Sequence, residues 1–216
     1  MADAREEHVW SEHALRDHTN LTPYVGCTYI DDLLKLTKGV KLVMDLGCGS
    51  GLWRPVFNKF KYIGLDQNKD MINVAKQHYP EAYVCHDPNA TWLNDWLGDT
   101  AFAQYNGRQI LTNIFDKGHI PDLVWCSAVL QHNRESDKDE IIKNVYNLLT
   151  PGKYWMFTEC TFDLAENNYK HVNNVYSEDM TDGWSYTSKG WERFMNDRGF
   201  KLVGMARFNY YLWERV

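Results

Sequence analysis

The stretch Lys41-Leu-Val-Met-Asp-Leu-Gly-Cys-Gly-Ser-Gly51 decides the fold of this chain of 216 residues. Its apolar half leads directly into three glycines, which is typical of a buried strand followed by a tight turn into a helix. Glycine allows the backbone to turn sharply and to approach a ligand without a Cβ in the way. The unpaired N–H groups at the start of the following helix offer a site for an anion. The sequence therefore predicts a nucleotide-binding loop at the end of a buried strand.

Short apolar segments alternate with helical patterns over most of the chain. Including the strand before the glycines, the pattern predicts seven strands, at 41–46, 62–66, 82–86, 122–127, 154–158, 201–205 and 208–214. Helices are expected in the opening 38 residues and at 52–60, 69–78, 136–149 and 188–198. This alternation favours an α/β fold with a doubly wound, mostly parallel, Rossmann-like sheet of seven strands. The last two strands are too close for a helical crossover, so they should form an antiparallel hairpin at one edge of the sheet.

The chain shows no linker or repeat, so we expect a single domain over residues 1–216. The helical residues 1–38 are predicted to fold over the site as a lid. Two long connections, 88–121 and 162–187, do not fit a minimal version of this fold. Long connections are often functional, and both lie near the carboxyl ends of the strands, where α/β sheets bind ligands. They are therefore predicted to build a substrate pocket.

Composition excludes several functional classes. Lys plus Arg is 23 and Asp plus Glu is 29, so the net charge is −6, which argues against a general nucleic-acid binder. No apolar run is long enough to span a membrane, and no signal peptide is apparent. The five cysteines are scattered and form no CxxC pair, so neither a metal site nor a disulfide framework is expected. These features favour a cytoplasmic protein with reduced thiols.

A carboxylate at the end of the second strand discriminates among nucleotide cofactors. Asp66 follows Gly47 by nineteen residues, where a carboxylate can accept hydrogen bonds from both ribose hydroxyls. Gly47, Gly49 and Gly51 form G-x-G-x-G instead of the G-x-G-x-x-G of dinucleotide sites. A nicotinamide oxidoreductase is therefore disfavoured.

Together, these features make the chain resemble the class I S-adenosylmethionine-dependent methyltransferases. Asp45-Leu-Gly-Cys-Gly-Ser-Gly51 is similar to their first motif, and Asp66 falls at their ribose acid. The resemblance covers roughly residues 40–160. It implies that the glycines shape the wall around the methionine part of S-adenosyl-L-methionine and that Asp45 orients its amino group, directly or through water. The other cofactor contacts that it implies are Gln67, Met71, His86 and Asp87 near the adenine, and Ser127 beside the amino acid.

The transfer itself needs little from the protein beyond holding the acceptor in line with the methyl group. His132, just beyond the fourth strand, is a candidate general base, because imidazole titrates near neutral pH. Glu159, at the end of the fifth strand, is a candidate for binding a cationic amine acceptor. Each also has a structural reading: His132 could bond to the backbone at a helix start, and Glu159 could pair with a neighbouring lysine or arginine. The aromatic residues Trp10, Tyr24 and Tyr176 are candidate substrate contacts.

The predicted function is methyl transfer to a small-molecule acceptor by in-line displacement, with S-adenosyl-L-homocysteine as product. One alternative is methylation of the amino terminus of a peptide or protein. Another is a binding subunit that keeps the fold without turnover. RNA methylation ranks lower because the net charge of the chain is negative. The sequence does not identify the acceptor, the atom methylated, the use of a base or the oligomeric state.

Overall fold

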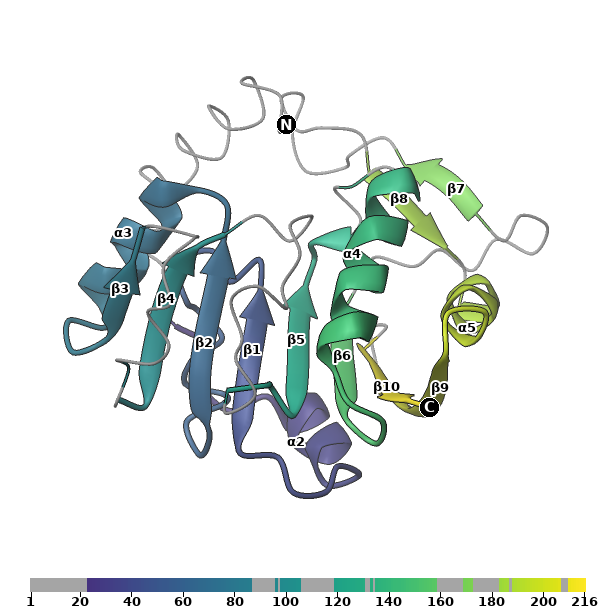
Figure 1. Cartoon of the computed structure of the whole chain (residues 1–216), viewed down its shortest axis with the longest axis horizontal. Coiled ribbons are helices and arrows are strands. Elements are labelled where there is room, and N and C mark those ends of the chain that lie inside the picture. Colours follow the sequence, from purple (N-terminus) through teal and green to yellow (C-terminus); the bar gives the residue numbers. More distant parts are fainter. Residues whose placement is uncertain are drawn as a thin grey trace.

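A computed structural model describes residues 23–86, 96, 98–105, 119–130, 133, 135–158, 169–172, 183–186, 188–206 and 210–216. Its centre is an eight-stranded sheet with the order β3-β4-β2-β1-β5-β6-β10-β9, seen in Figure 1 with the helices around it. The strands of this sheet are β1 (Leu42–Leu46), β2 (Lys61–Asp66), β3 (Tyr83–Cys85), β4 (Thr100–Gln104), β5 (Leu123–Ser127), β6 (Tyr154–Thr158), β9 (Phe200–Ala206) and β10 (Tyr210–Arg215).

The central strands are parallel, and the last two are not. β1 pairs in parallel with both β2 and β5, while β10 pairs antiparallel with β6 on one side and β9 on the other. This confirms the predicted α/β class, the mostly parallel sheet and the antiparallel hairpin at its edge. A separate hairpin is formed by β7 (Tyr169–Val172) and β8 (Gly183–Tyr186), inside the connection that was predicted to line the pocket.

The two faces of the sheet carry different helices. The described helices are α2 (Thr28–Leu34), α3 (Lys69–His78), α4 (Glu135–Leu148) and α5 (Ser188–Asn196). Successive residues of β1 point to opposite faces: Met44 packs in a cluster that includes residues of α4 and α5, while Val43 packs in one that includes residues of α2 and α3. All five residues of β1 are buried, as expected for a parallel strand covered on both sides. The sheet is therefore doubly wound, as predicted.

Two local features differ from the sequence prediction. The sheet has eight strands instead of seven, because β4 lies within the connection 88–121 and inserts between β2 and β3. The segment 52–60 is a series of turns, with i→i−3 bonds such as Arg54 N–H to the Gly51 carbonyl (3.0 Å), instead of the predicted helix. Pro55 supplies no N–H in this short segment, and tight turns suit such short pieces.

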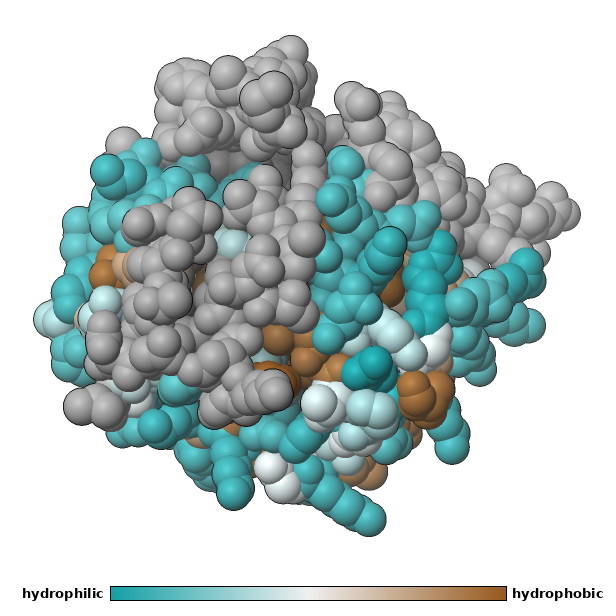
Figure 2. All heavy atoms as spheres, viewed as in Figure 1, coloured by the Kyte–Doolittle hydropathy of each residue, from teal (hydrophilic) through white to brown (hydrophobic). Residues whose placement is uncertain are grey.

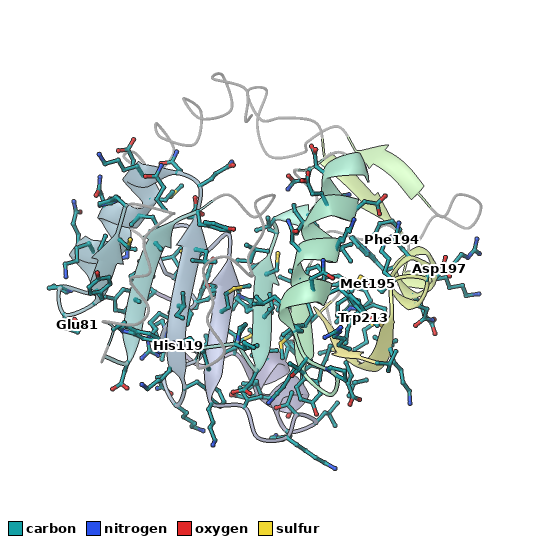
Figure 3. The ribbon with its side chains drawn as sticks, in the orientation of Figure 1. Glu81, His119, Phe194, Met195, Asp197 and Trp213 are labelled. Carbon is teal, nitrogen blue, oxygen red and sulfur yellow. The ribbon has the colours of Figure 1, made fainter. Side chains whose placement is uncertain are left out.

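Aromatic residues fill the space between α5 and the end of the sheet. Figure 3 shows Phe194 and Met195 of α5 near Trp213 of β10, whereas Asp197 points away from the sheet. Trp213 and Met195 are fully buried. Trp191, on the first turns of α5, packs on Phe157 of β6 with 4.9 Å between ring centroids. Apolar burial of this size fixes α5 against the sheet.

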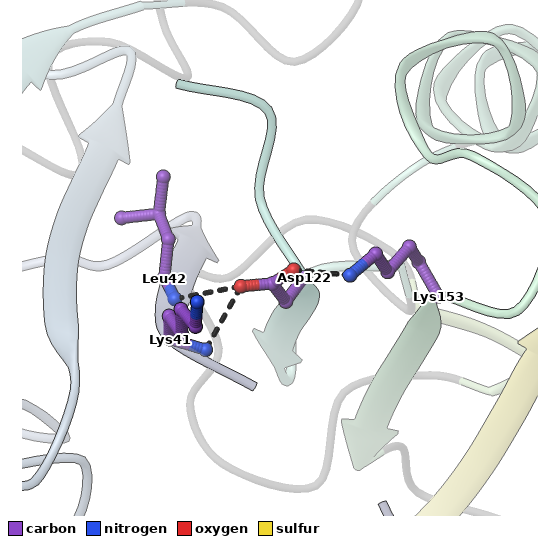
Figure 4. Close-up of polar contacts among 4 residues, drawn as sticks. All are labelled: Lys41, Leu42, Asp122 and Lys153. Carbon is purple, nitrogen blue, oxygen red and sulfur yellow. Dashed lines mark hydrogen bonds and ion pairs between the residues drawn. The ribbon is translucent and has the colours of Figure 1, made fainter. Parts of the chain in front are cut away.

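A polar contact joins three neighbouring strands at their amino-terminal ends. Asp122 accepts hydrogen bonds from the N–H groups of Lys41 (2.8 Å) and Leu42 (3.1 Å) and pairs with the Lys153 ammonium (Figure 4). These contacts connect the starts of β1, β5 and β6. They lie at the other end of the strands from the glycine turn, so they fix the sheet without touching the candidate site.

The described surface is mainly hydrophilic in the view of Figure 2, with hydrophobic residues in separate small patches. Among the residues that the structure describes, no helix is long and apolar enough to cross a membrane.

Candidate functional site

The glycine turn lies at the carboxyl end of β1, in the middle of the sheet. From β1 the chain builds β2, β3 and β4 on one side of this strand and then β5 on the other. Such a reversal of strand order leaves a crevice between the two neighbouring carboxyl ends, where open α/β sheets bind ligands. The sequence-predicted loop is therefore at the position where the topology favours a site.

Two of the glycines are required by the local geometry. Gly47 and Gly51 have φ of +74° and +76°, a left-handed conformation that side chains rarely adopt. A Cβ on Gly47 would overlap the side chain of Val129, and a Cβ on Gly51 would lie 2.8 Å from the ring of Phe102. The turn is thus packed directly against the residues that follow β5 and against the side chains of β4.

Asp66 holds the glycine turn from the end of β2. Its two carboxylate oxygens accept hydrogen bonds from the N–H of Gly49 (2.9 Å) and the N–H of Asn68 (2.8 Å). Burial raises the pKa of Asp66, and the two N–H donors oppose this rise. Asn68 in turn caps α3 by accepting from Asp70 and Met71. Each oxygen of Asp66 keeps further acceptor capacity, so the carboxylate can also bind a pair of hydroxyls.

Asp45 is fully buried on β1, two residues before the turn. One of its oxygens accepts from the hydroxyl of Tyr62 on β2, and the other has no hydrogen-bond partner among the residues that the structure describes. A buried carboxylate oxygen without a donor is costly. A cationic group at the turn would satisfy it, so the residues present fit the ammonium of an amino acid moiety.

The strand inserted beside β2 changes which residues surround Asp66. In the register of the sheet, Asp66 is paired with Gln104, the last residue of β4. The Gln104 side-chain amide donates to the backbone carbonyl of Gln67 (3.2 Å). His86 follows β3, which lies one strand further out, roughly 10 Å from Asp66 at the usual strand spacing. Gln104 is not among the residues predicted from the sequence, because the short segment Thr100–Gln104 has no clear strand pattern.

Several other predicted residues lie near this edge. Ser127 ends β5 and is partly buried; Gln67 is exposed, and Met71 is buried on α3. Ser127 is followed by Ala128, whose φ of +55° is unusual for a residue with a side chain. The structure thus places all three near the carboxyl ends of β2 and β5.

Tyr24 lies against the segment that follows the glycine turn. Its ring packs on that of Trp53 with 4.4 Å between centroids, and its N–H donates to the carbonyl of Leu52 (2.8 Å). Its side chain is 48% exposed. The other predicted residues lie outside the described part of the chain: Trp10, Asp87, His132, Glu159 and Tyr176. Among the residues described, no group of three or more His, Cys, Asp or Glu could hold a metal.

Comparison with known proteins identifies the family. A model of the family described as "Methyltransferase domain" matches residues 21–204. A SAM-dependent methyltransferase from Methanosarcina mazei has a similar structure, with a TM-score of 0.63 and 17% identity over 91% of this chain and 99% of that one. The glycopeptide N-methyltransferase MtfA, complexed with S-adenosyl-L-methionine, has a TM-score of 0.61 and 14% identity over 89% of this chain and 87% of that one.

A sequence relative gives a shorter match. The tRNA (carboxymethyluridine(34)-5-O)-methyltransferase ALKBH8 of Macaca fascicularis is 25% identical over 68 residues, which are 32% of this chain and 10% of the relative. The match therefore spans about a tenth of that protein. The family model, in contrast, covers well over half of the chain. The chain belongs to the methyltransferase domain family, which confirms its predicted place among the class I S-adenosylmethionine-dependent methyltransferases.

Proposed function

We propose that this chain transfers the methyl group of S-adenosyl-L-methionine to a small-molecule acceptor. The observation that carries the proposal is the cluster at the carboxyl ends of β1 and β2. A tightly packed glycine turn lies there with the buried Asp45 on one side and the partly exposed Asp66 on the other. A carboxylate for an ammonium and a carboxylate for a ribose, on either side of a glycine-rich turn whose Cys48 and Ser50 side chains are buried, suit the two polar ends of that cofactor.

The residues around the turn have separate tasks in this proposal. Asp66 accepts from the ribose hydroxyls, Asp45 orients the amino group, and Ser127 lies beside the amino acid. Gly47, Gly49 and Gly51 form the wall along the methionine chain. When bound, the cofactor supplies an activated methyl group whose transfer to an acceptor atom leaves S-adenosyl-L-homocysteine. The protein contributes positioning and the exclusion of water.

We propose Gln104 as a further residue at the adenine edge, beside His86 and Asp87, to which the resemblance assigns that role. It stands beside Asp66 in the sheet, on the strand next to β2. Because its amide nitrogen donates to the carbonyl of Gln67, its amide oxygen remains available to accept from the exocyclic amine of adenine. Gln67 and Met71 lie along the same edge. Gln104→Leu should weaken S-adenosyl-L-homocysteine binding by about 2- to 12-fold, the value of one hydrogen bond, and Gln104→Glu should retain most of the affinity.

The acceptor is proposed to be small. One structural neighbour is a methyltransferase of a glycopeptide and another is described as an amino pentose methyltransferase, whereas the sequence relative acts on tRNA. The net charge of −6 opposes a large polyanion. His132 as general base and Glu159 as the anchor of a cationic amine remain our proposals for acceptor activation, and Trp10, Tyr24 and Tyr176 those for substrate contact. The lid of residues 1–38 and the connections 88–121 and 162–187 are proposed to complete the pocket.

Calorimetry with S-adenosyl-L-methionine and S-adenosyl-L-homocysteine tests the cofactor site. Asp66→Ala should weaken binding by about 100-fold or more, because a charged acceptor for two hydroxyls is lost. Asp32→Ala is the matched control, since Asp32 is exposed on α2, where it pairs with Lys35, and its loss should leave affinity unchanged. Absence of binding by the folded wild-type protein would refute the proposed function.

An acceptor screen tests the rest of the proposal. Small amines and hydroxyl compounds, amino sugars, a peptide with a free amino terminus and tRNA are offered with the methyl donor. Turnover of the small molecules alone supports the proposal. Turnover of the peptide alone or of the tRNA alone would refute a small-molecule acceptor and assign the acceptor to that other class. Cofactor binding without any turnover favours the non-catalytic binding subunit.

A further inference from the structure

Asp45 and Tyr62 form a buried pair beneath the glycine turn. Asp45 stands on β1 and Tyr62 on β2, and neither side chain is exposed. The phenol hydroxyl donates to one carboxylate oxygen, while the second oxygen has no partner among the described residues. In the register of the sheet, Gly64 is the residue opposite Asp45 and Tyr62 the residue opposite Val43, so the phenol reaches Asp45 diagonally along the same face.

No cation balances this buried carboxylate within the described part of the chain. The guanidinium of Arg54 lies over the ring of Tyr62, 5.5 Å from its centroid. This guanidinium donates to Thr100 Oγ1 (2.7 Å) and to the Phe57 carbonyl (3.1 Å) instead of to Asp45. Arg54 thus makes a cation–π contact with the ring of Tyr62 but does not neutralise the carboxylate of Asp45.

Among the remaining titratable neighbours, Asp66 makes the charge on Asp45 still less favourable. Asp66 of β2, the Cys48 thiol of the turn and Tyr79, which directly follows α3, are the other titratable groups around the pair. Burial raises the pKa of Asp45 to about 7; the Tyr62 hydrogen bond opposes this rise, and the charge of Asp66 adds to it. The thiol of Cys48 and the phenol of Tyr62 both have their pKa raised well above the usual range by burial, so both stay neutral.

We propose that Asp45 is protonated in a large share of the empty molecules and gives up its proton when the ammonium group of the cofactor binds, with Tyr62 as the positioning residue that favours the ionised form. This inference rests on the proposed function. The proton on the Asp45 carboxyl passes to solvent, the ammonium keeps its own protons, and an ion pair forms directly or through one water molecule. No covalent bond between heavy atoms changes.

The direction of the pH dependence follows from this balance. Only the ionised share of Asp45 binds, so the apparent affinity is reduced by that share. With half-ionisation near pH 7, the ionised share is about one tenth at pH 6 and about nine tenths at pH 8. The affinity for S-adenosyl-L-homocysteine should therefore rise about tenfold from pH 6 to pH 8, with most of one proton released at pH 6 and almost none at pH 8.

Calorimetry with S-adenosyl-L-homocysteine from pH 6 to pH 8, in two buffers of different ionisation enthalpy, measures both affinity and proton release. Tyr62→Phe should move the midpoint of the affinity profile to higher pH, because the phenol that favours the ionised acid is gone. Tyr154→Phe removes a phenol from a buried tyrosine at the amino end of β6 and should leave the midpoint unchanged. Asp45→Asn should bind weakly, with no proton release attributable to this position.

A structural role alone would lower the affinity of Tyr62→Phe without moving its midpoint, and that result would overturn the inference. So would cofactor binding by the wild type with no proton release at pH 6. Absence of cofactor binding at every pH would refute the proposed function instead. A ¹³C carboxyl titration of the empty protein, compared with Asp45→Asn, then tests the protonation directly: a midpoint near pH 7 supports it, and one near pH 4 overturns it.

Discussion

Replacing Asp122 by alanine should lower the free energy of unfolding by about 2–3 kcal/mol. The carboxylate accepts from two backbone N–H groups and from the Lys153 ammonium. A hydrogen bond to a charged group contributes about 1.5–3 kcal/mol. Lys41 is exposed, so water replaces its bond, whereas Leu42 is only 8% exposed and its N–H loses its acceptor. The partly exposed pair with Lys153 adds at most about 1 kcal/mol.

Urea unfolding followed by circular dichroism measures this difference. Asp122→Asn keeps a neutral acceptor and should lose only about half as much free energy, and Lys153→Met should lose less than about 1 kcal/mol. Hydrogen bonds from Lys153, Lys41 and Leu42 outweigh the effect of burial and lower the pKa of Asp122 from its ordinary 3.8. Its stabilisation is therefore present above about pH 4 and is lost as the pH falls through the lowered pKa. A Lys153→Met variant as unstable as Asp122→Ala would refute the reasoning, because the ion pair would then outweigh the backbone contacts.

Three further substitutions test the packing around the site and the core. Gly47→Ala should lower the free energy of unfolding by about 2 kcal/mol, because Gly47 has a positive φ and an added Cβ would overlap Val129. Adding Val129→Ala should recover only part of this loss in thermal unfolding. Full recovery would contradict a contribution from the backbone conformation. Ala128→Gly should raise the free energy of unfolding by about 0.5–1 kcal/mol by relieving a left-handed alanine, whereas a loss of stability would argue against strain there. Trp191→Ala should cost about 3–5 kcal/mol in urea unfolding, since the ring is fully buried against Phe157; the exposed Lys189→Ala on the same helix should change stability by less than about 0.5 kcal/mol.

The strands that could be predicted from the sequence are those that are buried on both faces and have glycine or proline turns beside them. β1 and β5 are runs of mostly apolar residues, which is the pattern of parallel strands under two layers of helices. β4 was missed because its sequence, Thr-Ala-Phe-Ala-Gln, carries two alanines, which have a low strand propensity. It forms because tertiary pairing with β2 and β3 on both sides overrides that preference.

The candidate site could be predicted where it depends on one local motif. The glycine turn, Asp45 and Asp66 could be predicted because each lies at or near the end of a strand that the sequence itself indicates. The contact between Asp45 and Tyr62 depends on the register of β1 against β2, and the position of Gln104 depends on the order of strands in the sheet. Neither property is encoded in the spacing of residues along the chain, so sequence reasoning alone could not reach them.

The insertion of β4 has a consequence for how the molecule assembles. β3 precedes β4 in the chain, yet among the described strands it pairs with β4 and lies at the outer end of the strand order. The three residues Tyr83–Cys85 therefore reach the sheet through β4, a strand that is made later in the chain. This arrangement makes β2 pair with β4 across the intervening β3, which raises the separation in sequence that folding has to bridge and slows it. In native-state hydrogen exchange, the amides of β3 should accordingly open before those of β4 and β2.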